Sequence, residues 1–248
     1  MISKEEQILE DYLKAASVWA NTPRKRAVVI PSPQTEPKVK ENIPTKTIII
    51  GIGGLGGHAV SYFRQYSRYH VHSCSMDTTA KDLSNTQGTY RILLGKDELA
   101  GLGTGVNPEK SARLTQAILP EFERFLDLHE YAHVIVIAGA GGGTGSGAIP
   151  VIAKFLQQKK ITHHLCLTMP FNFEGKSKTQ IAHHTLQELH DSKLEAFTVD
   201  LQEMLESNPY ASFKQALDSS LQSIMHEIEG QLEPVTIPSE NYLGVVSL

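Results

Sequence analysis

Three segments of the chain are so rich in glycine that they could bind phosphate through their backbone. They are GIGGLGG at 51–57, GLGTG at 101–105 and GAGGGTGSG at 139–147. Glycine has no Cβ and adopts positive φ readily, so successive N–H groups of such a loop can turn toward one anion. In the third segment six of nine positions are glycine, and Thr144 and Ser146 add hydroxyl groups. This composition favours a polyphosphate ligand.

The first segment, taken alone, indicates a dinucleotide. Gly51, Gly53 and Gly56 match G-x-G-x-x-G after an apolar run. Asp77 follows the next β-like run, where a ribose-binding acid is expected. A dinucleotide site needs only one pyrophosphate loop, however. Three loops predict a ligand enclosed on several sides, as a nucleoside triphosphate would be, and an NAD-binding Rossmann enzyme is kept as a remote alternative.

Alternating apolar runs and helical patterns predict the elements that position these loops. We expect strands at 46–51, 71–76, 90–94, 132–138, 161–168 and 195–199, and helices at 57–69, 109–127, 146–159, 175–191 and 209–232. The runs IIIG, HVIVIA and HLCLT are apolar throughout, as strands buried on both faces are. The predicted fold class is therefore α/β, a doubly wound parallel sheet whose carboxyl edge gathers the glycine loops.

Two further parts flank the domain, which we expect at 45–232. Residues 3–20 show a helical apolar pattern and residues 21–44 are rich in proline, so 1–44 is expected to be an amphipathic helix and a linker. The helix either contacts a membrane peripherally or packs on the domain or on a second copy, and its acidic residues favour packing. Residues 233–248 are expected to form a short tail.

Composition and charge exclude several classes of protein. The formal net charge of −4 argues against nucleic-acid binding, which usually needs a broadly basic face. The two cysteines, Cys74 and Cys166, lie in apolar β-like runs, which is typical of buried free thiols in a reducing compartment. No run approaches the roughly 18 apolar residues that span a bilayer. We therefore expect a cytoplasmic protein.

Other chemistry-bearing residues favour neither a metal site nor a nucleophile. The pairs His163–His164 and His183–His184 lack i, i+4 spacing to a further ligand, so we predict no metal site made of side chains. The sequence around Ser146 is G-T-G-S-G, which does not match the nucleophile pattern G-x-S-x-G.

Four motifs in matching order carry a family resemblance. GIGGLGGHAV, GLGTGVNPE, GAGGGTGSG and PFNFEGKSK (170–178) resemble the phosphate-loop and ribose-contact motifs of the bacterial division GTPase FtsZ and of tubulin. The match covers roughly residues 46–232, and the chain is identified as a divergent, bacterial FtsZ-like member of the FtsZ/tubulin superfamily. The resemblance implies a GTPase-domain fold, GTP or GDP as ligand, and Mg²⁺ held mainly by phosphates and water.

The resemblance also assigns roles to individual residues. It implies phosphate contacts from Gly53, Gly54, Gly57, Gly103, Thr104, Gly105, Asn107, Gly141, Gly142, Gly143, Thr144 and Gly145. Asp77 and Thr78 fall in a second loop facing nucleotide and magnesium-bound water. Glu174 is placed at the ribose hydroxyls, and Lys178 stands near the phosphates where the family usually has arginine.

Recognition of the base departs from the family pattern. Phe213 keeps the aromatic residue that stacks on the base, whereas the asparagine position falls on Leu201 and the polar position of the long helix falls on Leu217. Asp200 and Gln202 flank the first position and Asp218 follows the second. A shift of one residue would restore carboxylates that accept hydrogen bonds from guanine.

Hydrolysis and assembly depend on the end of the chain. The family's N-x-D-x-x-D loop corresponds to PSENYL at 238–243, which places Glu240 at the middle acid as the candidate catalytic residue. The second domain of the family is expected to be absent, and GTP hydrolysis to be slow or absent. The expected function is a GTP-binding cytoskeletal protein in division or membrane remodelling, assembling with itself or with an FtsZ-like relative. The alternative is a non-polymerising regulator of a full-length relative.

Overall fold

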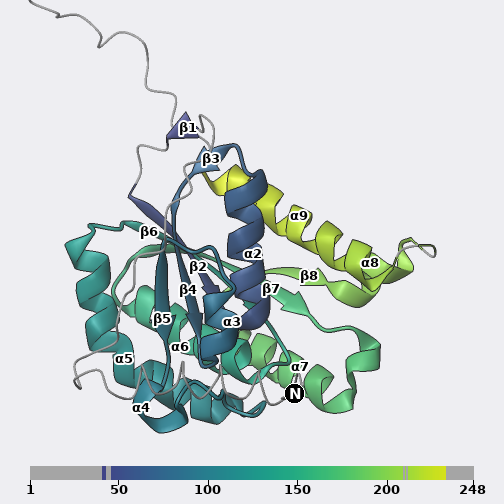
Figure 1. The fold of residues 1–248 in the computed structure, drawn as a ribbon, viewed down its shortest axis with the longest axis horizontal. Coiled ribbons are helices and arrows are strands. Elements are labelled where there is room, and N and C mark those ends of the chain that lie inside the picture. Colours follow the sequence, from purple (N-terminus) through teal and green to yellow (C-terminus); the bar gives the residue numbers. More distant parts are fainter. Residues whose placement is uncertain (1–40, 43–45, 209, 211, 233–248) are drawn as a thin grey trace, which may run out of the picture.

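The computed structural model describes residues 41–42, 46–208, 210 and 212–232. Within them, six strands form one parallel sheet in the order β5-β4-β2-β6-β7-β8 (Figure 1). They are β2 (Thr47–Ile52), β4 (His72–Asp77), β5 (Tyr90–Leu93), β6 (His133–Gly139), β7 (Thr162–Met169) and β8 (Phe197–Asp200). The predicted fold class is confirmed.

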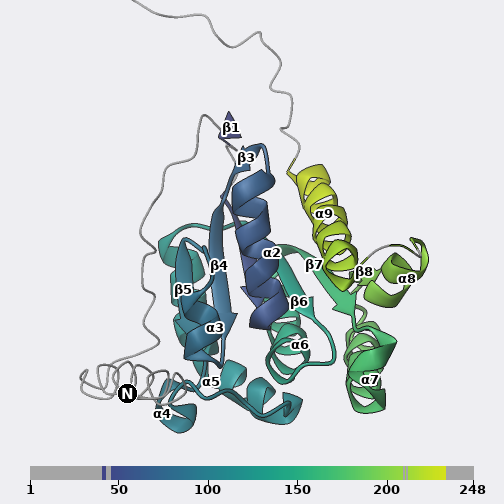
Figure 2. The ribbon, with the colours of Figure 1, turned by 45° about the vertical axis from the view of Figure 1, so that its right-hand side comes forward.

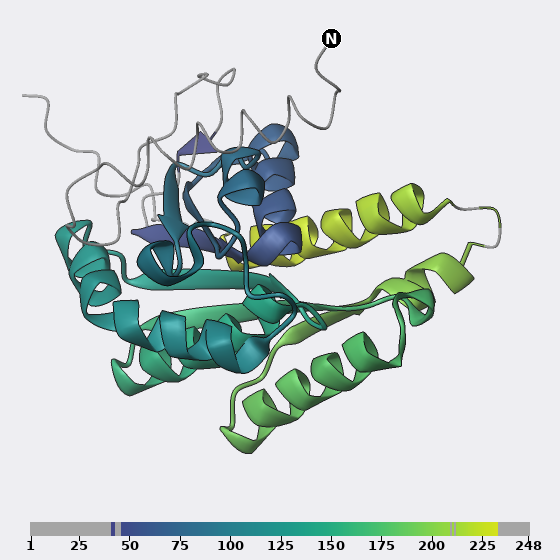
Figure 3. The same cartoon turned by 60° about the horizontal axis from the view of Figure 1, so that its bottom comes forward.

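Helices cover both faces of the sheet. They are α2 (Gly53–Tyr66), α3 (Ala80–Ser84), α4 (Lys96–Leu99), α5 (Pro108–Leu128), α6 (Gly143–Gln158), α7 (Lys176–Asp191), α8 (Leu201–Glu206) and α9 (Phe213–Gln231), with the 3-10 turn η1 (Asn172–Glu174). Figure 3 shows α2 and α9 on one side of the sheet and α5, α6 and α7 on the other. The sheet is therefore the middle of three layers, which explains why its central strands are apolar throughout.

Successive residues of the central strands β2, β6 and β7 supply two separate hydrophobic cores. In β2, Ile48, Ile50 and Ile52 join the core shared with α5 and α6, whereas Ile49 joins the core shared with α2 and α9. All four isoleucines are completely buried. Because neighbouring side chains of a strand point to opposite faces, one apolar run anchors helices on both sides.

The strand order places a switch point between β2 and β6. The chain winds outward from β2 through β4 to β5, and then from β6 through β7 to β8. At such a point the connections leave in opposite directions, and ligands of open α/β sheets bind beyond the carboxyl ends of the strands. Figure 2 shows these ends at the lower edge of the sheet, near α4 and the beginning of α5.

Element boundaries differ from the sequence-based expectation mainly at the glycines. The helices α2 and α6 begin at Gly53 and Gly143, within the glycine segments rather than after them. The segment at 101–105 follows the short helix α4, not a strand directly. The pattern at 209–232 becomes a helix only from Phe213, because Ser212 caps it, and α8 precedes it.

The flanking parts of the chain are described only in small part. The predicted N-terminal helix at 3–20, most of the linker and the tail at 233–248 lie outside the described residues. Glu41–Asn42, within the expected linker, form β1, which pairs in parallel with β3 (Tyr69–His70). In the part of the chain that the structure covers, no helix is long and apolar enough to cross a bilayer. Cys74 and Cys166 are buried free thiols, as predicted.

Candidate functional site

The three glycine segments meet at the carboxyl edge of the sheet. A Cβ at Gly53 would lie 3.2 Å from the backbone nitrogen of Gly145, so the start of α2 touches the start of α6. A Cβ at Gly143 would overlap the hydroxyl of Thr104 and lie 2.8 Å from the nitrogen of Asn107. The loop before α5 therefore packs directly against the loop before α6, as the sheet topology predicted.

Three glycines in this group face open space. A Cβ built on Gly54, Gly105 or Gly142 would meet no atom within 4 Å. The glycines on either side of Gly142 are not open in this way. A Cβ at Gly141 would lie 2.9 Å from the carbonyl oxygen of Lys178, and one at Gly143 would overlap Thr104. At these three positions the loops present bare backbone to open space, and this arrangement leaves room for an oxyanion.

Other glycines serve packing instead. A Cβ at Gly51 would overlap the carbonyl oxygen of Gly56, and one at Gly56 would lie 2.5 Å from the carbonyl oxygen of Ile137. These two members of the G-x-G-x-x-G pattern allow α2 to approach β2 and β6. A Cβ built on Gly57 would meet the side chain of Thr86. Gly57 therefore faces Thr86 and not the other glycines that were predicted to contact phosphate.

Backbone N–H groups at the helix starts are available to a ligand. The N-cap residues of α2 and α6, Ile52 and Gly142, make no side-chain cap hydrogen bond. A helix start leaves N–H groups without intrahelical partners and carries a partial positive charge, which suits an anion. The helix α5 differs, because the Asn107 side chain accepts a hydrogen bond from the nitrogen of Lys110 at 2.7 Å and caps the helix.

Two hydroxyl groups and one carboxyl group lie together where the loops meet. The hydroxyls of Thr78 and Thr144 are 2.7 Å apart. The Oδ1 atom of Asp77 accepts from the nitrogen of Thr79 at 3.0 Å and from the Thr144 hydroxyl at 3.4 Å. Asp77 is only 5% exposed, and burial raises its pKa from 3.8 to about 6. The structure thus brings together Asp77, Thr78 and Thr144, which the resemblance assigned to two different loops of the site.

The loop that carries Thr144 is braced by two serines. The Oγ atom of Ser146 accepts from the nitrogen of Gly141 at 2.8 Å, and Ser111 on α5 donates to the carbonyl oxygen of Thr144 at 3.0 Å. Both serine side chains are buried. Ser146 therefore holds the loop in shape from inside, which agrees with the prediction that it is no exposed nucleophile.

Glu174 and Lys178 lie beside this loop and contact each other. Glu174 accepts from the nitrogen of Phe171 through Oε1 at 3.0 Å and from the Lys178 amine through Oε2 at 2.8 Å. The contact of Gly141 with the Lys178 backbone places the start of α7 against the loop at 141–145. The site therefore offers an acceptor and a cation next to the open glycine space.

Three phenylalanines form a cluster next to Glu174. Phe171 and Phe173 stack with centroids 5.0 Å apart, and Phe173 lies 4.5 Å from Phe213. Phe171 is buried, whereas Phe173 and Phe213 are 59% and 56% exposed. The sequence predicted the aromatic role of Phe213 but missed Phe173, although PFNFEG shows two aromatic residues at i and i+2.

The remaining predicted positions have different environments. Leu201 is buried in an apolar cluster with Phe171 and Ala216, and Leu217 packs against the same cluster. Glu240 lies outside the described residues. In the described chain no three His, Cys, Asp or Glu side chains gather as metal ligands would. His163 contacts the carbonyl oxygen of Ile161 at 2.8 Å, and His164 contacts Glu227 at 2.9 Å.

Comparisons with known proteins agree on one family. Residues 46–209 match the family model described as Tubulin/FtsZ family, GTPase domain. The cell division protein FtsZ of Caulobacter vibrioides is 36% identical over 154 residues, which are 62% of this chain and 30% of that protein.

Two solved structures share the fold. The empty FtsZ dimer of M. jannaschii has a TM-score of 0.67 at 23% identity, covering 99% of this chain and 62% of that one. CetZ2 of Haloferax volcanii, a GTPγS-bound protofilament, has a TM-score of 0.65 at 25% identity, covering 76% and 58%. The chain spans less than two thirds of the length of these relatives.

Proposed function

The chain belongs to the Tubulin/FtsZ family through its GTPase domain, and from this we propose that it binds GTP or GDP and acts as an FtsZ-like cytoskeletal protein. Assembly would be with copies of itself or with an FtsZ-like relative, in division or membrane remodelling. The family match also argues against the NAD-binding alternative.

The observation that carries this proposal is the open space bordered by bare backbone at the carboxyl edge of the sheet. Gly54, Gly105 and Gly142 border it, and the helix starts at Gly53 and Gly143 supply N–H donors. A chain of phosphates suits this arrangement, because backbone N–H groups and helix starts together favour anions. Lys178 would add a positive charge, and Glu174 would accept hydrogen bonds from ribose hydroxyls.

Three side chains that carry oxygen atoms lie beside the proposed phosphate site. They fit a magnesium ion that is held mainly through the nucleotide. Asp77, Thr78 and Thr144 supply a carboxyl group and two hydroxyls in mutual contact. Mg²⁺ keeps several waters and takes few protein ligands in such sites, so these three residues would orient its water molecules. When bound, the ion would neutralise charge on the phosphates.

Slow hydrolysis is the proposal for catalysis. The supporting feature is the sequence PSENYL at 238–243, in which Glu240 is the candidate acid that positions water but Leu243 stands at the final acidic position of the family pattern. Support for assembly comes from relatives: one is a cell division protein, and CetZ2 forms a GTPγS-bound protofilament. By analogy with the family, Glu240 would act on the nucleotide site of a neighbouring copy.

A glycine substitution that fills the open space tests binding. We expect Gly142→Ala to weaken GTP binding at least tenfold in a calorimetric titration, because its methyl group takes space that phosphates would occupy. Gly142 has an ordinary φ of −89°, so the folded chain tolerates alanine there. Gly230→Ala is the matched control, because a Cβ there also meets no atom within 4 Å but lies near the end of α9. Equal GTP affinity in both variants would contradict the proposed site.

Sedimentation and phosphate release test assembly and hydrolysis. We expect GTP to increase the sedimented fraction of the full chain, with slow phosphate release that rises with protein concentration. A chain that binds GTP and stays monomeric at all concentrations would instead favour the non-polymerising regulator. Rapid hydrolysis by the isolated monomer would contradict the proposed role of Glu240 in a neighbouring copy.

A further inference from the structure

The end of the site beyond Glu174 is apolar and aromatic. Phe173 and Phe213 are each more than half exposed, although their rings lie only 4.5 Å apart. Phe173 precedes Glu174 in the chain, and the Phe171 nitrogen binds the Glu174 carboxylate. A nucleotide with its phosphates at the glycine loops and its ribose at Glu174 therefore directs its base toward these rings.

Beneath the rings lies a buried apolar cluster. Phe171, Leu201 and Ala216 are buried in it, and Leu217 packs against it from α9. Leu55, from the first glycine segment, packs against the same cluster. The apolar cluster thus extends from the first phosphate loop to α8 and α9. None of these five side chains has a hydrogen-bonding group to offer the edge of a base.

Polar side chains at the end of β8 are already engaged within the protein. Asp200 caps α8, because its Oδ1 atom accepts from the nitrogens of Gln202 and Glu203 at 2.8 and 3.2 Å. The Gln202 side chain accepts from the nitrogen of Asn172 at 3.1 Å and donates to Glu206 at 2.7 Å. The Gln202 amide is therefore committed at both its oxygen and its nitrogen, and Asp200 is held in the cap of α8 through Oδ1.

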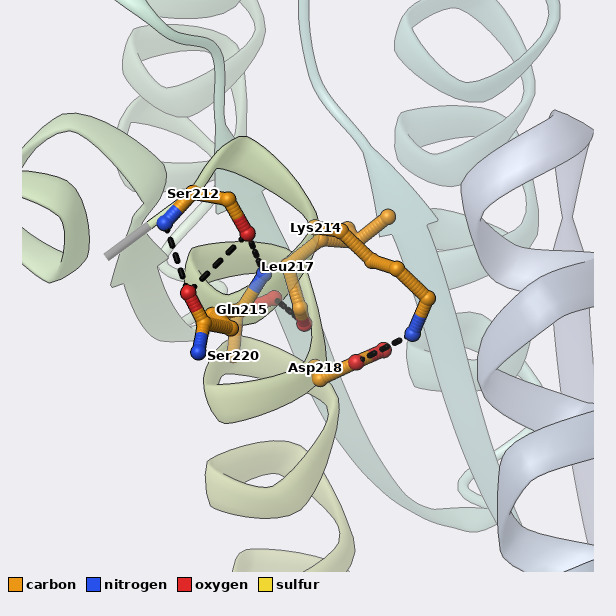
Figure 4. A network of polar contacts seen from close by, with 6 residues as sticks. All are labelled: Ser212, Lys214, Gln215, Leu217, Asp218 and Ser220. Atoms are coloured by element: carbon orange, nitrogen blue, oxygen red, sulfur yellow. Dashed lines mark hydrogen bonds and ion pairs between the residues drawn. The ribbon is translucent and has the colours of Figure 1, made fainter.

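The acid on the long helix is also engaged. Asp218 accepts from the Lys214 amine at 2.6 Å, and Figure 4 shows both side chains on the side of α9 that faces α2. On that side, burial, Tyr66 and then the Asp218 charge raise the pKa of Tyr62 on α2. In the first turn of α9, Ser212 and Gln215 form a capping box, in which each side chain accepts a hydrogen bond from the backbone nitrogen of the other (Figure 4). Asp218, the residue that a one-residue shift would offer to the base, is thus paired with Lys214 on the side of α9 that faces α2.

Resting on the proposed function, we infer that this site selects a nucleoside triphosphate by stacking on Phe173 and Phe213, not by hydrogen bonds to the base edge, and that it binds ATP about as tightly as GTP. Every base has a π face, so stacking tolerates any of them. A site that hydrogen-bonds its ligand with buried polar groups rejects the analogue lacking the partner by roughly 10⁴-fold. Asn172, the remaining polar side chain of η1 besides Glu174, is exposed, so water competes for its hydrogen bonds and it cannot supply such discrimination.

Calorimetric titrations with GTP, ATP and inorganic tripolyphosphate, each with Mg²⁺ and the full chain, test this inference. The expected dissociation constants for GTP and ATP agree within tenfold. A preference for GTP of a hundredfold or more overturns the inference and leaves the proposed triphosphate site intact. Binding of neither nucleotide overturns the proposed function, and the inference with it.

Substitution of one ring tests the stacking contact directly. Phe213→Ala is expected to weaken GTP and ATP binding by the same factor, about tenfold, and to leave tripolyphosphate binding unchanged. Phe213 is half exposed, so its truncation leaves the core intact. Leu128→Ala is the matched control, because Leu128 is 80% exposed at the end of α5, by the opposite edge of the sheet. Loss of GTP binding alone would show base-edge recognition and contradict the inference.

Discussion

The amine of Lys178 donates a hydrogen bond to the Oε2 atom of Glu174 at 2.8 Å, across one turn at the start of α7. The sequence assigned these two residues to different parts of a nucleotide, the phosphates and the ribose. In the structure the cation and the acceptor neutralise each other beside the open glycine space. A bound nucleotide would therefore share Lys178 between its phosphates and Glu174.

Removing the Lys178 charge is expected to weaken nucleotide binding with little effect on stability. In Lys178→Gln, loss of a charged contact to phosphate costs about tenfold or more in affinity. The free energy of unfolding changes by about 0.5 kcal/mol or less, because an i, i+4 ion pair with a 40% exposed lysine contributes little. Calorimetric titration and urea unfolding measure the two effects.

Lys154→Gln is the control for the Lys178 prediction. Lys154 on α6 pairs with Glu188 on α7 at 2.6 Å, and its side chain is 38% exposed. The same charge is removed there, but well along both helices from the glycine loops. Equal losses of nucleotide affinity in the two variants would show a general effect of net charge and contradict a specific role for Lys178.

Gly51→Ala is expected to damage the fold itself. Its Cβ would overlap the carbonyl oxygen of Gly56 and lie 2.7 Å from Val60, so α2 would have to move away from β2. Overpacking of this kind costs about 3 kcal/mol, which urea unfolding would detect as a lower midpoint. Gly142→Ala, whose methyl group meets open space, is expected to change the midpoint only slightly. Similar midpoints for both variants would contradict the packing role of Gly51.

Much of the fold could be predicted because its strands carry an unmistakable pattern. The Ile48–Ile52 segment and the strand at 133–139 are apolar on both faces, and only a covered sheet buries both. The short helix α8 was missed, although Asp200 followed three residues later by Glu203 is a helix-start signal. The start of α9 was placed too early because the helical pattern continues upstream of its cap, Ser212.

The site could be predicted from the sequence only where neighbours in the chain form it. The glycine segments predicted backbone loops, and these loops meet at the carboxyl edge of the sheet. The contact of Phe173 with Phe213 joins residues 40 positions apart, and no local pattern reveals it. Nor does the sequence show that Asp218 pairs with Lys214 toward α2, although their i, i+4 spacing permits it. The direction in which a side chain points depends on packing between helices.

Acid is expected to destabilise the protein through His133, at the edge of the sheet opposite the glycine loops. Burial, and then His164 and His163 on the neighbouring strand, lower the pKa of His133. A lowered folded-state pKa means that the unfolded chain binds the proton first, so this contribution is present above pH 6.5 and is lost as the pH falls. His133→Gln should lose less stability than the unsubstituted chain between pH 7 and 5 in urea unfolding. If the free energies of unfolding of the two proteins fell in parallel with pH, His133 would not be the source of the acid destabilisation.

Asp77 is expected to have the opposite pH dependence. Burial raises its pKa from 3.8 to about 6, so the folded state favours the protonated acid. Its contribution to stability is therefore present below pH 3.8 and is lost as the pH rises through 6. Asp77→Asn removes this loss and should gain about 2 to 3 kcal/mol relative to the unsubstituted chain between pH 4 and pH 8. Urea unfolding across that range measures the difference, and a difference that does not change with pH would show that the carboxyl group is not perturbed by burial.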